Sequence, residues 1–508
     1  MSDTARNETL PPLSTGGWFR WIWRQFTSMR TALILLFLLA VASIPGSIFP
    51  QRGVNPLKTK EWIADAPTWG PILDRLGFFE VYSSPWFSAI YILLFISLIG
   101  CVLPRAAAHW RAMRTPPPPA PRNLSRMQSH TVLEGADEAD VDRASDYLRA
   151  HRWHVLRGET DGVAWVSAEK GYLKETGNLL FHLALIFILV GVAVGGLFGW
   201  KGNVIVKNGD GFSNTLTQYD VWGGGRFADP AALPPFSFTM TDFRVQFDRS
   251  VAQRGSPSLF QADVTYKANP DSMPEPSTIE VNHPLEVDGA KVFLVGHGYA
   301  PRYVVRDSTG EIVFDDTVVA LPQDGNFTST GVIKLPDASP QLGFDIVFYP
   351  TLQPGSIISA FPAPDFPASY LAAWTGDPGL DTGIPQSVYK LDKTNMTQIG
   401  RVPALLPGQT WTLPNGEGSI SLTGYERWAS FQIAFDPGKE LALIASALAL
   451  TGLMLSLFVR RRRIWLKVSS NANGDTVVEI AGLNRTEGGD VSADILTVTE
   501  VIVGKEKE

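Results

Sequence analysis

Four stretches almost free of charge constrain the fold of this sequence more than any other feature. They cover residues 31–50, 86–103, 176–199 and 439–459 of a 508-residue chain. Each has close to the ~20 residues that an α-helix needs to cross a bilayer core of about 30 Å. The rest of the sequence has an ordinary polar composition. We therefore predict a polytopic α-helical membrane protein with four transmembrane helices and large soluble parts.

The first apolar stretch is predicted to be a retained span rather than a cleaved signal peptide. A long tail precedes it, and its end, SIPGSIFP, offers no small-residue cleavage site of the A-x-A kind.

The arginines flanking the spans predict the orientation. They lie before the first span, after the second and after the fourth: Arg20, Arg24, Arg30, Arg105, Arg111, Arg114, Arg122, Arg126 and Arg460 to Arg463. Positive charges beside spans favour the cytoplasmic side. Both termini are thus expected in the cytoplasm, with residues 51–85 and 200–438 outside it.

These features predict a division of the chain into nine segments. Short stretches rich in β-branched and aromatic residues, separated by Pro and Gly, make the largest one a mainly-β domain, either an antiparallel sandwich or an open barrel. The segments are a cytoplasmic tail and interfacial segment (1–30), a first span (31–50), an extracytoplasmic loop (51–85), a second span (86–103), a cytoplasmic linker with a small α/β module (104–175), a third span (176–199), the extracytoplasmic β-rich domain (200–438), a fourth span (439–459) and a cytoplasmic tail (460–508).

Several classes of function find no support in the sequence. Cys101 is the single cysteine, so the chain has no disulfide, no CxxC redox pair and no CxxCH haem-attachment site. It also lacks GxSxG, HExxH and P-loop motifs. The basic residues gather at the predicted membrane boundaries, so no nucleic-acid partner is expected. We assign no catalytic residue.

His182 is the main candidate functional residue. It lies inside the third apolar stretch, GNLLFHLALIFILVG, and an ionisable residue within a span is a functional-site hypothesis by default. If the span begins near Thr176, His182 lies about 9 Å along the helix axis, towards the cytoplasmic side. Asn178 and Glu175 are expected one and two turns earlier on the same face.

The residues alone leave three roles open for His182. It could form a hydrogen bond across a helix interface, ligate haem iron or another metal, or serve proton transfer or a quinone headgroup. A haem ligand normally has an axial counterpart. His109, just beyond the second span, is the nearby candidate in this chain; otherwise a partner protein must supply it.

Two further features bear on packing. Gly191, Gly195 and Gly199 form a GxxxGxxxG series on a side of the helix away from His182, where another helix could approach closely. In the β-rich segment, His283 and His297 could face each other across a hairpin, but structural roles at turns are the simpler interpretation.

The ordered set of motifs resembles the ResB family of cytochrome c biogenesis proteins, which belong to the System II haem-attachment pathway. The resemblance rests on FTSMRTALILLFLLAVASIPGSIFPQ, SPWFSAIYILLFISLIGCVLPR, GNLLFHLALIFILVGVAVGGLFGWKGNVIVKNGD, IEVNHPLEVDGAKVFLVGHGYAP and DPGKELALIASALALTGLMLSLFVRRRRIW. These motifs span nearly the whole chain, with a long domain between the third and fourth spans.

The resemblance implies a haem-handling membrane subunit. Its partner would be a ResC or CcsA-type membrane protein with a tryptophan-rich WWD motif, and together they would move haem outward and attach it to apocytochrome c. His182 would be an axial ligand of haem b, held transiently and shared with the partner, with Asn178 supporting it and His109 as the alternative ligand. No metal other than haem iron is implied.

The resemblance also implies a location and further contacts. The chain would be a multi-pass protein of the bacterial plasma membrane, in contact with membrane lipid, and a thioredoxin-like thiol reductant is a further candidate partner. Because the sequence has no WWD-like motif, the chain is expected to be an accessory subunit of the synthase without complete activity alone. The competing hypotheses are a non-catalytic scaffold or sensor whose β domain binds a partner protein, and an electron-transfer protein.

Overall fold

The structure, a computed structural model, describes residues 14–54, 56–127, 129–353, 355–380, 388–470, 475–486 and 490–504. It divides into two compact units. The first combines Met1–Ala193 with Gly438–Glu508, and the second is Val194–Pro437.

Four helices of the described chain are long and apolar enough to cross a membrane. Local signals set the starts of two of them: the Ser28 side chain accepts a hydrogen bond from the Thr31 N–H, and Ser84 does the same for Phe87. The four helices are α2 (Met29–Ile48), α5 (Pro85–Arg114), α7 (Leu173–Phe198) and α8 (Lys439–Phe458). All four belong to the first unit, except that the last residues of α7 belong to the second.

Helix α5 extends well beyond the predicted end of the second span at residue 103. It continues through Pro104 to Arg114, and the residues after the proline, RAAAHWRAMR, are mostly strong helix formers. His109, predicted to follow the span, is therefore part of the same helix and is buried.

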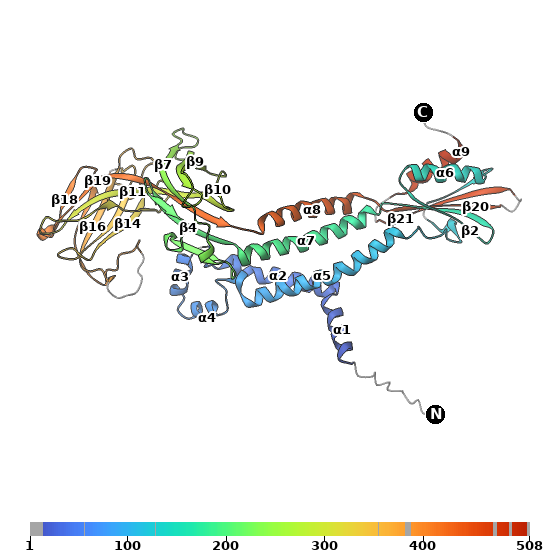
Figure 1. Ribbon diagram of the computed structural model, residues 1–508, viewed down its shortest axis with the longest axis horizontal. Coiled ribbons are helices and arrows are strands. Elements are labelled where there is room, and N and C mark those ends of the chain that lie inside the picture. The colour runs from blue at the N-terminus through green and yellow to red at the C-terminus, as the bar shows by residue number, and fades with distance from the viewer. Residues whose placement is uncertain are drawn as a thin grey trace, which may run out of the picture. The chain divides into compact units, whose positions relative to one another are not determined.

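Helices α7 and α8 lie side by side and meet through small residues (Figure 1). Gly177, Ala184 and Gly191, spaced by seven residues, are the buried positions of α7. A Cβ added at Gly177 would lie 2.6 Å from the Gly452 carbonyl oxygen of α8. Without side chains at these points the two backbones approach closely, as in membrane helix pairs.

Of the predicted glycine series, Gly191 thus lies against α8. A Cβ at Gly191 would lie 2.9 Å from the Gly438 carbonyl oxygen. Gly199 follows the end of α7, and a Cβ there would lie 2.9 Å from the Phe435 carbonyl oxygen. The close approach of another helix that the glycines predicted is therefore present, and α8 of the same chain is the neighbour.

The first unit also has short helices. They include α1 (Thr15–Phe26), α3 (Pro56–Asp65), α4 (Trp69–Arg75), η1 (Val81–Ser83) and η2 (Leu124–Arg126). Of these, η2 packs against the sheet described below. The segment between α2 and α5, predicted as a loop, has a small core of its own, because Phe79 and Val81 are fully buried.

A five-stranded antiparallel sheet completes the first unit. Its order is β1-β21-β20-β3-β2, so the two strands from the C-terminal tail lie between β1 on one side and β3 and β2 on the other. The strands are β1 (Ser129–Glu134), β2 (His154–Thr160), β3 (Val163–Lys170), β20 (Arg462–Ser470) and β21 (Thr476–Asn484), and helices α6 (Glu138–Ala150) and α9 (Ser492–Val503) share its core. Segments 104–175 and 460–508, predicted as separate parts, contribute strands to one sheet in the structure.

The described residues of the second unit form mostly antiparallel strands, arranged in three sheets. The seven-stranded sheet contains β4 (Trp200–Lys207), β6 (Val221–Gly224), β10 (Leu285–Val287), β11 (Ala290–Arg306), β12 (Ile312–Thr317), β18 (Thr410–Thr412) and β19 (Ser419–Phe435). The four-stranded sheet contains β5 (Gly211–Ser213), β7 (Ser237–Phe247), β8 (Pro257–Lys267) and β9 (Glu275–Glu280). The five-stranded sheet contains β13 (Leu321–Pro322), β14 (Ser329–Leu335), β15 (Leu342–Tyr349), β16 (Ala368–Asp377) and β17 (Asn395–Leu405).

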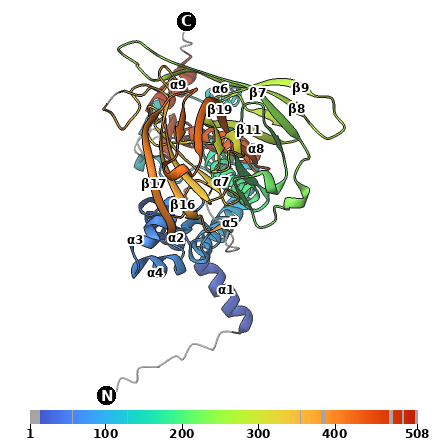
Figure 2. The same cartoon turned by 90° about the vertical axis from the view of Figure 1, so that its left-hand side faces the viewer.

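Strands β11 and β19 run through both halves of this unit. Each has 17 residues, and together they contribute to two separate hydrophobic cores. One core lies against the four-stranded sheet and the other against the five-stranded sheet; Figure 2 shows β11 and β19 between β7–β9 and β16–β17. The predicted mainly-β domain is confirmed. The long β11–β19 pair forms one layer, and a second sheet packs against it at each end.

Candidate functional site

His182 lies on a face of α7 that does not contact α8. At about 100° per residue, it is roughly 140–160° around the helix from Gly177 and Ala184, which face α8. Its side chain is half-buried, and its ring lies edge-on to Phe181 at 5.2 Å between centroids.

The hydrogen bond of His182 determines which ring nitrogen is available. Nδ1 lies 2.7 Å from the backbone carbonyl oxygen of Asn178. A carbonyl only accepts, so Nδ1 must carry the proton and donate. In the neutral ring Nε2 then keeps a lone pair, and it has no hydrogen-bond partner among the described residues. This is the arrangement commonly found in metal-bound histidines, where a carbonyl orients the ring from behind.

Asn178 contacts the histidine through its backbone. The supporting role of Asn178 in haem binding stays a prediction; in the structure its main-chain oxygen accepts the hydrogen bond from the His182 ring. The two residues are one helical turn apart, so the contact follows from helix geometry and does not depend on the asparagine side chain.

The His182 face of α7 is held to α5 at both ends. Glu175, His182 and Leu189 are spaced by seven residues and so share a face. Glu175 Oε2 lies 3.3 Å from His109 Nδ1, and the Leu189 carbonyl accepts a 3.1 Å hydrogen bond from the Tyr91 hydroxyl. His182 therefore lies midway between two attachment points to α5.

Both ring nitrogens of His109 are engaged. Nδ1 faces Glu175, and Nε2 lies 2.9 Å from the Thr176 hydroxyl. The side chain is 8% exposed. For His109 to bind iron, as the sequence analysis allowed, one of these contacts would first have to break.

A buried glutamate links the sheet of the first unit to the helices. Glu169, on β3, is 1% exposed and lies 2.6 Å from Arg461 Nε and 2.6 Å from Arg463 Nη2. Arg463 is its cross-strand partner on β20. Arg461 also donates to Glu175 at the start of α7. A continuous chain of charged contacts thus runs from the sheet through Arg461 and Glu175 to His109.

The arginines keep Glu169 ionised. Burial alone would raise its pKa, but the ion pairs with Arg463 and Arg461 outweigh burial and hold the pKa below the usual value of a glutamate. The carboxylate is therefore charged at neutral pH. A buried charge of this kind is tolerated only while its partners stay in place.

His283 and His297 lie in different surroundings. His283 is exposed in the turn after β9, where its N–H bonds the Glu280 carbonyl. His297 lies in the middle of β11, not in a turn, and is 8% exposed among phenylalanines. It stacks on Phe327 at 4.5 Å, and burial, reinforced by the Arg427 charge, lowers its pKa to about 3. We find no pairing of the two histidines in the structure.

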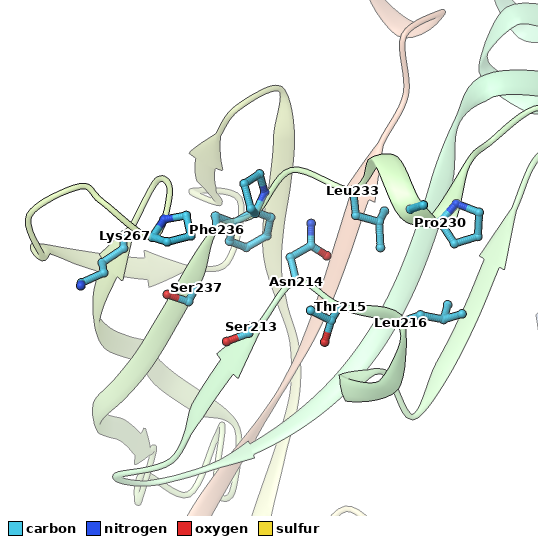
Figure 3. A pocket seen from close by; sticks show the side chains of 12 residues that line it. Ser213, Asn214, Thr215, Leu216, Pro230, Leu233, Phe236, Ser237 and Lys267 are labelled. Carbon is cyan, nitrogen blue, oxygen red and sulfur yellow. The ribbon is translucent and has the colours of Figure 1, made fainter.

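Other site types receive little support in the described part of the chain. No group of His, Cys, Asp and Glu there could hold a metal ion. A pocket of about 500 Å³ lies in the second unit beside β5 and β7, and it contains none of the sequence-predicted site residues. Figure 3 shows its mixed lining, in which Asn214 and Lys267 stand among Leu216, Leu233 and Phe236.

Glu169 was not predicted as a site residue, and the arginines after α8 were predicted only to flank the membrane. The partners Glu169 and Arg461 are 292 residues apart, so no local pattern joins them. The signal in the sequence was a glutamate that directly follows small and apolar residues, Val166 to Ala168, within the predicted strand GVAWVSAEKG.

Comparisons with known proteins show the family of the chain. The model of the ResB-like family matches residues 29–495. The cytochrome c biogenesis protein CcsB of Synechococcus sp. (strain CC9311) is 30% identical over 280 residues, which are 53% of this chain and 58% of that protein. The chain thus covers a little over half the length of this relative.

Two further relatives have similar names. CcsB of Thermosynechococcus vestitus is 24% identical over 457 residues, covering 88% of this chain and 89% of that protein. The cytochrome c biogenesis protein Ccs1 of Phaeodactylum tricornutum is 26% identical over 279 residues, covering 53% and 61%. The similarity therefore extends over helices and β domain alike.

Proposed function

Because the chain belongs to the ResB-like family, we propose that it is a subunit of a System II cytochrome c haem lyase that binds haem within the membrane and helps to carry it across. Haem b is the expected cargo, held transiently. Attachment to apocytochrome c is the expected end of the pathway, and this chain alone is not expected to complete it.

One observation carries the proposal: His182, on a candidate membrane helix inside the matched family region, donates through Nδ1, while Nε2 has no hydrogen-bond partner in the described part of the chain. Iron of a haem binds a neutral imidazole through such a nitrogen. A bare imidazole on an apolar helix face has a desolvation cost that ligation would offset.

Each region of the chain has a role in the proposed function. His182 supplies one axial ligand from α7, and a ResC or CcsA-type membrane protein with a WWD motif supplies the other. The α8 contact and the two α5 contacts fix the rotation of α7, and so the direction of His182. The chain would span the bacterial plasma membrane with both termini inside, and the β domain would lie outside the cytoplasm, where it would meet apocytochrome c or a thioredoxin-like reductant.

The test is spectroscopic. The chain is co-purified with its WWD-type partner, and the Soret band of the complex is recorded for the unmodified chain, for His182→Ala and for the exposed His283→Ala as a control. We expect His182→Ala to weaken or shift the band and His283→Ala to leave it unchanged. An unchanged band in His182→Ala would remove the ligand assignment.

A genetic test separates the haem lyase from the scaffold alternative. In a strain lacking this chain, holocytochrome c should disappear while apocytochrome c is still made. The unmodified chain should restore it, and His182→Ala should not. Full restoration by His182→Ala would favour a scaffold whose β domain acts through protein contacts.

A further inference from the structure

The first helix, α1, leaves most of its large apolar side chains uncovered. At about 100° per residue, five of them fall within an arc of roughly 140°, and two arginines fall opposite. The apolar arc consists of Trp18, Phe19, Ile22, Trp23 and Phe26, with exposed fractions between 37% and 77%. Trp21 is the one large aromatic outside this arc, packed edge-on to Trp18. Arg20 and Arg24 form the basic face.

A short, hydrogen-bonded connection, residues Thr27 and Ser28, joins α1 to the candidate span α2. The Thr27 hydroxyl donates to the Trp23 carbonyl at 2.8 Å, which closes the end of α1. The Thr31 hydroxyl donates to the Gln25 carbonyl at 2.6 Å, and Ser28 caps the start of α2. The connection is only two residues long, so α1 cannot move far from the end of the span.

Helix α5 contacts this connection and holds it in place. The Cys101 thiol donates to the Thr27 carbonyl at 2.7 Å, and Gly100 leaves room for the Thr27 side chain, which contacts the position where a Cβ would stand. Figure 1 shows α1 turning away from the line of α2 and α5. If α2 crosses the bilayer, α1 therefore runs along its surface.

We propose that α1 lies in the plane of the membrane interface, with its apolar arc in the acyl boundary and Arg20 and Arg24 at anionic phospholipid headgroups. An in-plane helix requires an apolar face, a basic face and Trp at the boundary, and α1 has all three. The positive charge of the basic face selects an anionic leaflet. The inference does not depend on haem binding.

The test uses the full chain in lipid nanodiscs. Cys101→Ser removes the single cysteine and keeps a hydroxyl donor for Thr27, so one new cysteine can carry an environment-sensitive fluorophore. Phe19→Cys places it in the apolar arc. Gly17→Cys, about 190° from the centre of that arc, is the matched control on the opposite face.

Two quenchers report the position of the fluorophore. We expect a lipid with a nitroxide high in its acyl chain to quench the Phe19 label at least about twofold more than the Gly17 label, and aqueous iodide to do the reverse. A Phe19 label quenched by iodide alone would place the helix in water. A Phe19 label protected from both quenchers would mean that a protein surface covers the arc. Either result overturns the proposal.

The lipid charge is tested separately. Nanodiscs of phosphatidylcholine alone are compared with discs containing phosphatidylglycerol, and the double variant Arg20→Gln, Arg24→Gln is measured in both. Iodide should reach the Phe19 label more readily in the uncharged discs and in the double variant. Equal accessibility in all four samples would overturn the anionic preference.

Discussion

His182 donates its Nδ1 proton to the backbone carbonyl of Asn178, one helical turn earlier, at 2.7 Å. This single contact fixes the tautomer of the ring and leaves Nε2 as the nitrogen able to bind a ligand. It also makes the position of the imidazole independent of the side chain at residue 178.

The first prediction follows from that contact. Asn178→Ala keeps the backbone carbonyl and a good helix former, so the haem spectrum of the complex with the WWD-type partner should not change. His182→Ala should lose the band or alter its position. Loss of the spectrum in Asn178→Ala would instead show that the amide side chain takes part in haem binding.

The second prediction concerns Arg461. Arg461→Met leaves Glu169 with one partner fewer and removes the contact to Glu175, so it should destabilise the chain by about 3 kcal/mol, seen as a lower melting temperature in detergent. Arg462→Met is the matched control: Arg462 pairs with Asp494 at 2.6 Å on α9 and is more exposed. If both variants melt at the same temperature, the buried Arg461–Glu169 pair contributes no more to stability than the Arg462–Asp494 pair.

The third prediction concerns acid stability in the β domain. The folded pKa of His297, about 3, lies below the unfolded value near 6.5, so the unfolded chain binds the extra proton. The contribution of His297 is fully present above pH 6.5 and declines as pH falls towards 3, by up to about 1.4 kcal/mol per pH unit.

The matched variant for this test is His297→Phe, which keeps a planar ring among Phe243, Phe260 and Phe327. Urea unfolding at pH 7 and at pH 5 should show a smaller loss of stability in the variant than in the unmodified chain. The same loss in both would assign the acid sensitivity to other groups.

The fourth prediction tests the α7–α8 contact. A Cβ at Gly452 would lie 2.5 Å from the Phe181 backbone nitrogen, so Gly452→Ala should separate the helices and lower stability by about 1–3 kcal/mol. Gly196, in the partner helix α7, has open space around it, and Gly196→Ala should be neutral or slightly stabilising. Thermal unfolding in detergent measures both, and equal effects would mean that helix propensity alone decides.

Much of the candidate site could be predicted from local sequence. Four apolar runs predicted four helices, because length and hydropathy are local properties that need no partner. His182 stood out for the same reason, since an ionisable side chain in an apolar run is costly wherever the helix packs. The mainly-β character of residues 200–438 followed from composition and turn residues.

Tertiary structure alone decided which segments meet. Strands β3 and β20 pair although some 300 residues separate them, and this pairing buries Glu169 against Arg461 and Arg463. The tertiary structure also places His297 inside an aromatic cluster and packs α8 against Gly177. Sequence periodicity reports which face of an element is apolar, but the partner of that face depends on long-range packing, and no local pattern contains it.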